Sequence, residues 1–409
     1  MTRQTASLSA ATQRSVLLLS FATFSSMAVQ RMCDAMLPEL SRVFSVTLAQ
    51  AAQVVSVFAV VYGLSQLFYG PMGDRLGKFK VLTFATLACS VGCIAAAFAP
   101  SLDMLVAARV LVALGAAAII PLSLAWIGDA VPYERLQATL ARVGLGTTLG
   151  IVGGQLIGGL FTDTLGWRWA FGFMTLLFGA VGTLLLSDLR QQSVKADLPG
   201  AHWPLAPVDR PGFMAQTLGI ITGPWSRVVL MVAFVEGAAG FGVLAIWASH
   251  LHQTLGLKLS IAGLIVAMFG FGGMVYMATA RVLIGRFRPS ALAVCGVALL
   301  GVSTLVLGFS PFWWPTVPAS LVGGFGFFMF HNTMQTNATH MAPHARGTAV
   351  SLFASFLFLG QSAGVYAAAL LIERLGSGVV IALGGGTLFA VGSFFCLALR
   401  RREGQVHQP

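Results

Sequence analysis

The sequence predicts an all-α integral membrane protein, with twelve transmembrane helices in two pseudo-symmetric six-helix bundles. Three observations lead to this fold class: a composition suited to lipid, twelve apolar runs long enough to cross a bilayer, and short motifs that recur in both halves. Of the 409 residues, 57% are hydrophobic and only 9% are charged. Soluble domains carry about 25% charged residues. So few charges cannot cover a water-soluble fold of this length, so most of the surface must face lipid.

Twelve apolar runs meet the length of a membrane span. An α-helix rises about 1.5 Å per residue, so crossing the hydrocarbon core takes about 20 residues. The predicted spans are residues 15–37, 50–72, 81–100, 104–127, 138–160, 169–187, 228–249, 260–280, 290–309, 316–338, 348–371 and 378–399.

One long polar stretch divides the predicted spans into two sets of six. It lies between the sixth and seventh spans and contains acids, bases and several prolines. We therefore expect an N-terminal six-helix bundle over residues 1–187, a cytoplasmic linker over 188–227 and a C-terminal six-helix bundle over 228–409. The last part would end in a short basic cytoplasmic tail.

The placement of Lys and Arg residues predicts the orientation. If the N-terminus is cytoplasmic, seventeen of the 24 bases lie in inner segments, four in outer segments and three within spans. Cytoplasmic loops carry such an excess of bases. We therefore expect a multi-pass protein of the bacterial inner (plasma) membrane, monomeric, with both termini cytoplasmic. The formal net charge of +11 then reflects orientation in the bilayer rather than binding to nucleic acid.

Two short motifs recur in the second half at nearly the same offset. The motif Gly285-Arg286-Phe287-Arg288 follows one predicted span as Gly77-Lys78-Phe79-Lys80 follows another. Likewise, Pro132-Tyr133-Glu134-Arg135 aligns with Pro343-His344-Ala345-Arg346. Because both offsets agree with the hydropathy pattern, they indicate a parallel repeat of the kind found in transporters.

The charged stretch from Gly70 to Lys80 lies between the second and third predicted spans and combines acid, bases and glycines. It resembles the G-x-x-x-D-R-x-G-[RK]-x-[RK] loop signature of the major facilitator superfamily. The chain as a whole resembles the twelve-helix drug:proton antiporter branch of that superfamily. This resemblance implies the major facilitator fold, alternating access, and a gating role for Gly70, Asp74, Arg75 and Gly77.

Asp74 is the acid of this stretch. A helix N-terminus favours an anion, because its backbone N–H groups are unpaired and its dipole is positive. The resemblance implies that Asp74 accepts hydrogen bonds at the start of the 348–371 span and holds an inner gate closed.

A glycine repeat marks the 138–160 span. Gly150, Gly154 and Gly158 recur every four residues, and small residues at this spacing let helices approach closely. The run resembles the antiporter signature g-x-x-x-G-P-x-x-G-G, with Gln155 where the family usually has proline. We expect these three glycines to form a moving, gating interface. The absence of the proline favours the alternative of an importer or uniporter.

Two acids lie well inside predicted spans. An ionised side chain at mid-bilayer costs about 2.5–3.5 kcal/mol on insertion scales, so embedded charges are functional candidates. Asp34 is predicted to couple protons and to bind substrate, with Arg31 on the same helical face as a second binding residue and possible ion-pair partner. The alternative is a buried structural pair, or an acid that reaches outward to the interface.

Glu236 is the second embedded acid. It lies near the middle of the 228–249 span, and no base stands three or four positions away. Burial favours the neutral carboxyl, so a carboxyl that alternates between wet and dry surroundings can load and release a proton. We predict that Glu236 couples protons and contacts substrate. The alternative is a permanently neutral, hydrogen-bonded acid.

Further polar residues are predicted to bind substrate. Arg109 lies within the 104–127 span and is expected to stabilise an ionised Asp34; its alternative is an arginine that reaches to the interface. The 316–338 span contains a polar run in which His331, Asn332 and Gln335 are the candidates. His331 can change charge near neutral pH. The alternative for this run is hydrogen bonding between helices without substrate.

Together these patterns predict a secondary active transporter that exports a small organic molecule in exchange for protons. A drug, a metabolite or a siderophore-like compound would each fit. The alternatives are a proton-coupled importer or uniporter and, on weaker grounds, a lipid-handling or sensory member of the same fold. No sequence motif of an enzyme or a phosphate-binding loop is present. We therefore expect no enzymatic activity, no cofactor and no metal, with the proton gradient as the energy source.

Overall fold

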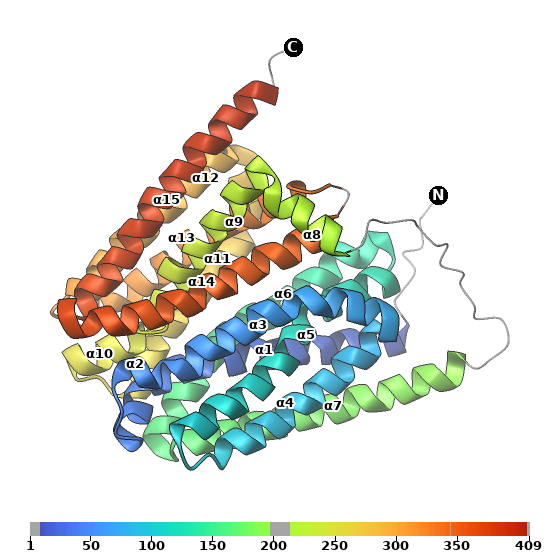
Figure 1. The fold of residues 1–409 in the computed structure, drawn as a ribbon, viewed down its shortest axis with the longest axis horizontal. Coiled ribbons are helices and arrows are strands. Elements are labelled where there is room, and N and C mark those ends of the chain that lie inside the picture. The colour runs from blue at the N-terminus through green and yellow to red at the C-terminus, as the bar shows by residue number, and fades with distance from the viewer. Residues whose placement is uncertain (1–8, 197–212, 344, 407–409) are drawn as a thin grey trace.

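The structure is a computed structural model that describes residues 9–196, 213–343 and 345–406 (Figure 1). These residues form helices joined by short turns, and no strand occurs among them. The prediction of an all-α protein is therefore confirmed. Eleven helical segments within these residues are long and apolar enough to cross a membrane: Ala10–Val43, Leu48–Leu76, Lys78–Ala97, Leu102–Ala130, Glu134–Thr164, Trp167–Gln191, Pro224–Leu255, Leu259–Arg286, Pro289–Phe309, Arg346–Leu375 and Ser377–Arg402.

The helices fall on either side of residues 197–212, which lie outside the described residues. The first part of the chain forms α1 (Ala10–Val43), α2 (Leu48–Ala51), α3 (Gln53–Leu76), α4 (Lys78–Ala97), α5 (Leu102–Ala130), α6 (Tyr133–Thr164) and α7 (Trp167–Ala196). The second part forms α8 (Phe213–Thr222), α9 (Pro224–Glu236), the π-helix η1 (Gly237–Gly242), α10 (Trp247–Leu255), α11 (Leu259–Arg286), α12 (Pro289–Phe309), α13 (Thr316–His340), α14 (Arg346–Leu375) and α15 (Ser377–Val406).

Helix α13 contains the tenth predicted span, residues 316–338. It has 25 residues and is long enough to cross a bilayer. It is not among the eleven apolar segments, because six of the seven residues from His331 to Asn337 are polar. Its least apolar part therefore needs partners inside the protein, since lipid offers no hydrogen bonds.

Most helices extend beyond the predicted spans. Helix α1 begins at Ala10 rather than at residue 15, and the side chain of Ser9 caps it by accepting a hydrogen bond from the backbone N–H of Thr12. The hydropathy pattern marks only the apolar part of a helix. Helical turns that reach into the polar region of a bilayer are polar, so the pattern leaves them out.

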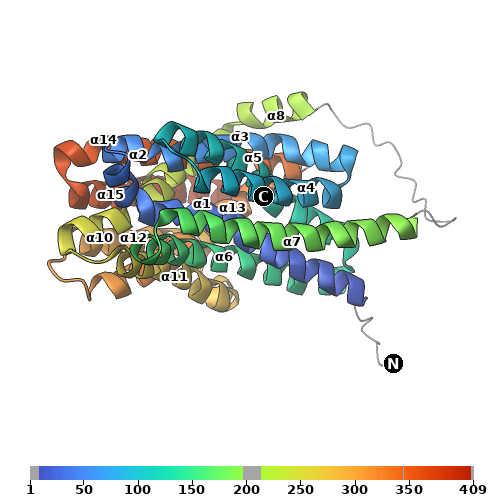
Figure 2. The same ribbon diagram turned by 90° about the horizontal axis from the view of Figure 1, so that it is seen from below.

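The two parts of the chain meet along two pairs of helices. In the first part α1 packs on α6, α4 packs on α5 and α7, and α3 packs on α5. In the second part α12 packs on α13 and α15, and α14 packs on α9 and η1. Between the parts, α3 lies along α14 and α6 lies along α11 (Figures 1 and 2).

The molecule has two distinct ends. We call the end that carries the start of α1 and the close of α15 the terminal end. We call the end that carries the turns at residues 44–47, 256–258 and 376 the far end. Helices α7 and α15 diverge from the far end toward the terminal end (Figure 1). The two parts of the chain are therefore closer together at the far end.

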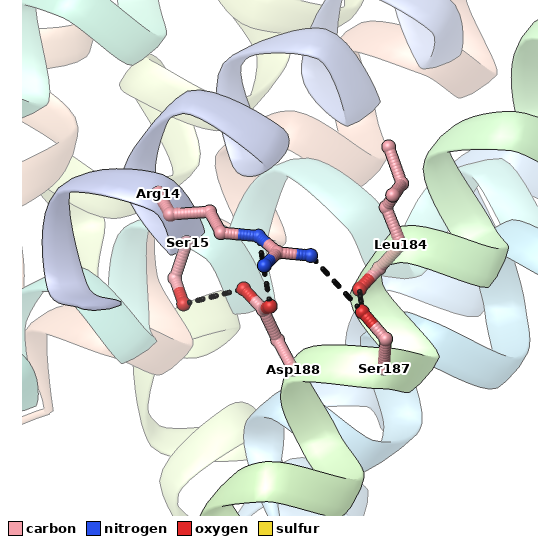
Figure 3. Close-up of polar contacts among 5 residues, drawn as sticks. All are labelled: Arg14, Ser15, Leu184, Ser187 and Asp188. Carbon is pink, nitrogen blue, oxygen red and sulfur yellow. Dashed lines mark hydrogen bonds and ion pairs between the residues drawn. The ribbon is translucent and has the colours of Figure 1, made fainter. Parts of the chain in front are cut away.

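The predicted linker boundary at residue 188 falls inside α7, which continues to Ala196. Asp188 is buried and binds the start of α1 (Figure 3). Its Oδ1 lies 3.1 Å from Nε of Arg14, and its Oδ2 accepts a hydrogen bond of 3.1 Å from the hydroxyl of Ser15. Arg14 also donates to the hydroxyl of Ser187 at 3.1 Å. These contacts join α1 to α7 at the terminal end.

Candidate functional site

Glu236 and His331 form a buried pair. Glu236 is the last residue of α9 and is 0% exposed. Its Oε1 lies 2.8 Å from Nδ1 of His331 on α13. The sequence pointed to the two residues separately, and the packing of α13 beside α9 brings them together. An acid and an imidazole at this distance share one proton-bearing hydrogen bond, whichever group holds the proton.

A π-helix follows Glu236 directly. The predicted span 228–249 lies within the apolar segment Pro224–Leu255, which the structure divides into α9, η1 and α10. Glycines allow the change: a Cβ at Gly237 would lie 1.8 Å from the carbonyl oxygen of Leu357, so η1 contacts the backbone of α14. Short π-helical segments are rare and are frequent at functional sites. The irregular backbone begins directly after Glu236.

Aromatic rings surround His331. The imidazole stacks on Phe327 with ring centroids 5.8 Å apart and an interplanar angle of 9°. The ring centroid of Phe353, on α14, lies 5.8 Å from that of His331. The ring centroid of Phe241, on η1, lies 6.4 Å from it. The side chain of His331 is 18% exposed, whereas that of Glu236 is fully buried. The carboxyl of this pair is therefore shielded from solvent, whereas its imidazole is partly accessible to solvent.

A second buried pair joins Arg31 and Asp34 on α1. Nη1 of Arg31 lies 3.5 Å from Oδ2 of Asp34, as the spacing on one helical face predicted. Gln155 of α6 donates a hydrogen bond of 3.0 Å from its Nε2 to the same carboxylate oxygen. All three side chains are buried. The sequence marked Gln155 only as a departure from the antiporter signature, and the structure shows that its amide binds the embedded acid.

Arg109 forms no hydrogen bond or ion pair with Asp34, and its expected role in stabilising an ionised Asp34 stays a prediction. Its Nη1 donates to the carbonyl oxygen of Val29 at 2.7 Å, and its Nε donates to that of Val54 at 3.3 Å. The guanidinium also lies over the ring of Phe58, 3.9 Å from the centroid. Arg109 is fully buried and binds α5 to α1 and α3 through backbone oxygens. Its Nη2 is buried and has no hydrogen-bond partner among the described residues.

Two further contacts join the two parts of the chain. The guanidinium of Arg31 lies 4.2 Å from the ring centroid of Phe241, which also neighbours His331. Gln30 of α1 donates to the side-chain oxygen of Gln361 on α14 at 3.4 Å. Phe241, Gln30 and Gln361 were not predicted. Both glutamines carry an amide inside an apolar run, and this was the sequence signal that could have marked them as candidates.

The rest of the α13 polar run is divided between two environments. Asn332 donates a hydrogen bond of 2.9 Å to the hydroxyl of Tyr276 on α11. This matches the alternative of hydrogen bonding between helices. Gln335, one turn beyond His331, is exposed. The three predicted substrate-binding residues of α13 therefore do not form one cluster.

The charged stretch at the terminal end is mostly helical. Helix α3 continues through Gly70, Asp74 and Arg75 to Leu76, and only Gly77 breaks it, with a φ of 92° that favours glycine. The carboxylate of Asp74 is 70% exposed and lies 3.6 Å from Nζ of Lys78. The expected contact with the first turn of α14 is therefore not formed in this conformation.

The glycine run of α6 packs within the first part of the chain. A Cβ at Gly150 would lie 2.5 Å from the carbonyl oxygen of Phe24, and one at Gly158 would lie 2.0 Å from that of Met32. Gly154 likewise faces Ala28. The three glycines therefore contact α1 rather than the second part of the chain. These positions form a close contact between α1 and α6, and the gating role expected of them stays a prediction.

Asp163 joins the two parts at the far end. It lies near the end of α6, and its carboxylate accepts hydrogen bonds from the backbone N–H of Ser260 at 2.6 Å and of Leu259 at 3.3 Å. These residues begin α11, whose N-cap Lys258 offers no side-chain hydrogen bond. Asp163 therefore caps a helix of the other part, where both the free N–H groups and the helix dipole favour an anion.

A family comparison agrees with this arrangement. A family model described as the Major Facilitator Superfamily matches residues 19–365 and also residues 229–409. The chain belongs to the Major Facilitator Superfamily. The superfamily resemblance found in the sequence is therefore confirmed, and the protein is a membrane transporter by family.

Several relatives within the superfamily are similar over part of their length. The uncharacterized transporter YwfA of Bacillus subtilis is 22% identical over 75% of this chain and 70% of its own. The uncharacterized transporter YybF of the same organism is 27% identical over 37% of each chain. The multidrug export protein EmrB of Escherichia coli is 25% identical over 44% of this chain. The matches span 37% and 35% of the lengths of YybF and EmrB.

Solved structures of superfamily transporters share the fold. The structure of a peptide transporter POT has a TM-score of 0.75 at 15% identity and covers 96% of both chains. A bacterial homologue of the human lysosomal transporter Spinster, solved in an inward-facing and unoccupied conformation, has a TM-score of 0.70 at 16% identity and also covers 96% of both. At such identities the likeness extends to the fold alone.

Proposed function

We propose that this superfamily member exports a small organic molecule in exchange for protons by alternating access. In this proposal α13 crosses the membrane together with the eleven apolar segments, so twelve helices span the inner (plasma) membrane of a bacterium. They form two six-helix bundles, residues 1–187 and 228–409, joined by a cytoplasmic linker. Both termini are cytoplasmic, so the terminal end faces the cytoplasm. The observation that carries the proposal is the buried pair of Glu236 and His331 beside a π-helix.

Glu236 has the environment that a proton carrier needs. Its carboxyl is fully buried and has one titratable partner within hydrogen-bond distance, His331. When η1 and α14 shift against each other, the surroundings of Glu236 change, because the residue lies at the junction of α9 and η1. A carboxyl that becomes wet on one side and dry on the other gains and loses a proton in turn. His331 supplies a route between the acid and the accessible space.

Asp34 provides a second ionisable site in the other bundle. Arg31 and Gln155 stabilise its charged form by an ion pair and a hydrogen bond. A cationic substrate, or a proton, would compete with Arg31 for this carboxylate. A carboxylate and a guanidinium side by side also suit a zwitterion, which would bind both. These two acids in two bundles are the basis for exchange of substrate against protons.

Two points support the proposed direction of transport. The glycine run of α6 and the charged stretch after the second span resemble those of drug:proton antiporters. One partial relative, EmrB, is named as a multidrug export protein. A proton-coupled importer or uniporter is the second candidate, and Gln155 favours it, because this residue replaces the signature proline and binds Asp34.

The test first identifies a ligand and then measures its transport across a membrane. A thermal-shift screen of purified protein against metabolites and cationic dyes, repeated at pH 6 and pH 8, selects compounds that stabilise the protein. A selected compound is then loaded into proteoliposomes with an imposed pH gradient. Export coupling predicts that flux follows the gradient and that Glu236→Gln abolishes this dependence.

Two results separate the candidates. Flux of the selected compound that ignores the pH gradient, and is unchanged in Glu236→Gln, contradicts proton coupling and supports a uniporter. Flux in the same direction as the protons supports an importer. The control variant is Gln191→Glu, which changes charge at an exposed position of α7 outside both buried pairs. Gln216→Glu is less suitable, because Gln216 binds Thr348.

A further inference from the structure

A groove lies between α9 and α15 at the terminal end. It has a volume of about 560 Å³ and is lined by Trp225, Val228, Phe394, Leu397, Arg401 and Arg402, among others. Phe394, Leu397 and Arg401 stand three and four residues apart and therefore share one face of α15. Phe394 and Leu397 are each 58% exposed. In a membrane protein such apolar exposed side chains face hydrocarbon.

The groove lies at the edge of the membrane-spanning segments. Pro224 is the first residue of one candidate span, and Arg402 is the last residue of another. The helical rise of about 1.5 Å per residue places Arg402 about 7 Å beyond Leu397 along α15. The apolar side chains thus lie at hydrocarbon depth, while the two arginines lie at the depth of lipid headgroups.

The two arginines present cations at the mouth of the groove. Both are exposed, and the described residues contain no ion pair for either of them. The guanidinium of Arg402 lies 4.5 Å from the ring centroid of Trp225, so it is held against the groove wall. An aromatic face leaves the N–H groups at the guanidinium edge available to an anion.

A second groove on the same helix offers an internal comparison. It is lined by Val379, Leu383, Gly386 and neighbouring small residues nearer the far end, and its volume is about 430 Å³. It is apolar and contains no base. Any acyl chain would fit such a surface. Only the groove at the terminal end adds positive charge at headgroup depth.

We propose that the groove between α9 and α15 binds an acidic phospholipid. Its phosphate contacts Arg401 and Arg402, and one acyl chain lies along Trp225, Phe394 and Leu397. Basic pockets between membrane helices recognise acidic headgroups in this way, and bases near the surface contribute about 1 kcal/mol each. The bound lipid joins the start of α9 to the end of α15. This inference does not depend on the substrate or on the direction of transport.

Native mass spectrometry of delipidated full-length protein tests the proposal. Phosphatidylglycerol and phosphatidylcholine with identical acyl chains are added in separate titrations. We expect phosphatidylglycerol to bind more tightly. Replacing both arginines, Arg401→Gln with Arg402→Gln, should weaken its binding about 30-fold, which corresponds to ~2 kcal/mol for two bases. The matched control is Arg400→Gln, in the same basic run but not in the groove lining.

Three outcomes overturn the proposal. Equal binding of the two lipids would show a groove that is selective for acyl chains only. Equal loss in Arg400→Gln would show a general effect of charge. Competition by inorganic phosphate at the same concentration as the lipid would show an anion site without a lipid. A second variant, Ala398→Phe, fills the groove without changing charge, and it should reduce phosphatidylglycerol binding while the thermal midpoint of unfolding is retained.

Discussion

The two ends of the molecule use acids near helix starts in different ways. At the far end, Asp163 of the first part accepts two backbone hydrogen bonds from the first turn of α11 in the second part. At the terminal end, Asp74 is exposed and contacts Lys78, four residues along the same chain segment. One acid thus connects the two parts of the chain, and the other does not.

The gate predicted at Asp74 and the contact observed between the two parts at Asp163 therefore lie at opposite ends of the molecule. Alternating access requires that one end opens when the other closes. A far end held by Asp163 on the start of α11 is compatible with an Asp74 that does not contact the start of α14. We therefore expect the two acids to bind their helices in turn.

The largest effect is expected for Asp163→Asn. Hydrogen bonds to a charged group contribute about 1.5–3 kcal/mol, so losing the charge should shift the equilibrium at least about tenfold away from the closed far end. Spin labels at the exposed residues Phe98 and Phe312 report the distance across this end. Asp103→Asn is the matched control, because Asp103 is an exposed acid at the same end. Unchanged label distances in Asp163→Asn would contradict a latch.

The next effect is expected for Gly159→Ala. A Cβ at this position would lie 2.4 Å from the carbonyl oxygen of Leu259, so α6 and α11 must separate at the far end. Overpacking of this kind costs about 1–3 kcal/mol. The same spin labels should report a wider far end. Gly172→Ala on α7 is the control, since its Cβ would meet only Trp169, at 3.9 Å. If both variants behave alike, the close approach does not control the gate.

A smaller effect is expected for Lys78→Met. Nζ of Lys78 lies 2.5 Å from Oδ2 of Asp129 on α5, and both partners belong to the first part of the chain. Exposed ion pairs contribute about 0.2–1 kcal/mol. The thermal midpoint of unfolding should fall slightly, while the distance across the far end stays constant. A change in that distance would show that the charges at the terminal end already couple to the far end in this conformation.

The smallest effect on this conformation is expected for Asp74→Asn. The carboxylate is 70% exposed and its ion pair with Lys78 is long, so stability should change little. Labels at Leu76 and Phe287, both exposed at the terminal end, should give the distances of the unmodified protein. Transport should nevertheless slow, because the opposite conformation would lose its latch. Normal flux in this variant would remove Asp74 from the gating cycle.

The sequence predicted those features that follow from the cost of contact with lipid. Apolar runs must be long enough to span, so eleven of the spans were found with errors only at their polar ends. Embedded charges are costly, so Asp34 and Glu236 were visible as site candidates. Arg31 was visible as a partner because both residues lie on one helix. The same reasoning gave no partner for Glu236, since its partner comes from α13.

The features that were missed depend on packing between helices distant in the chain. Asp163 lies at a helix end, where an acid costs little, so nothing in the sequence marks it. The spacing of the α6 glycines correctly predicted a close contact between helices. It could not show whether the neighbouring helix is α1 or α11. Gln155 was visible as a substitution, and only the packing of α1 on α6 shows that it binds Asp34.

The ring of Phe241 has one more consequence. It contacts Arg31 of one ionisable pair and neighbours His331 of the other. A shared neighbour makes the occupancy of one pair alter the energy of the second, and linkage requires the effect to be equal in both directions. We therefore expect a change in the contacts of either pair to alter the other through this ring. Phe241→Leu should weaken that coupling.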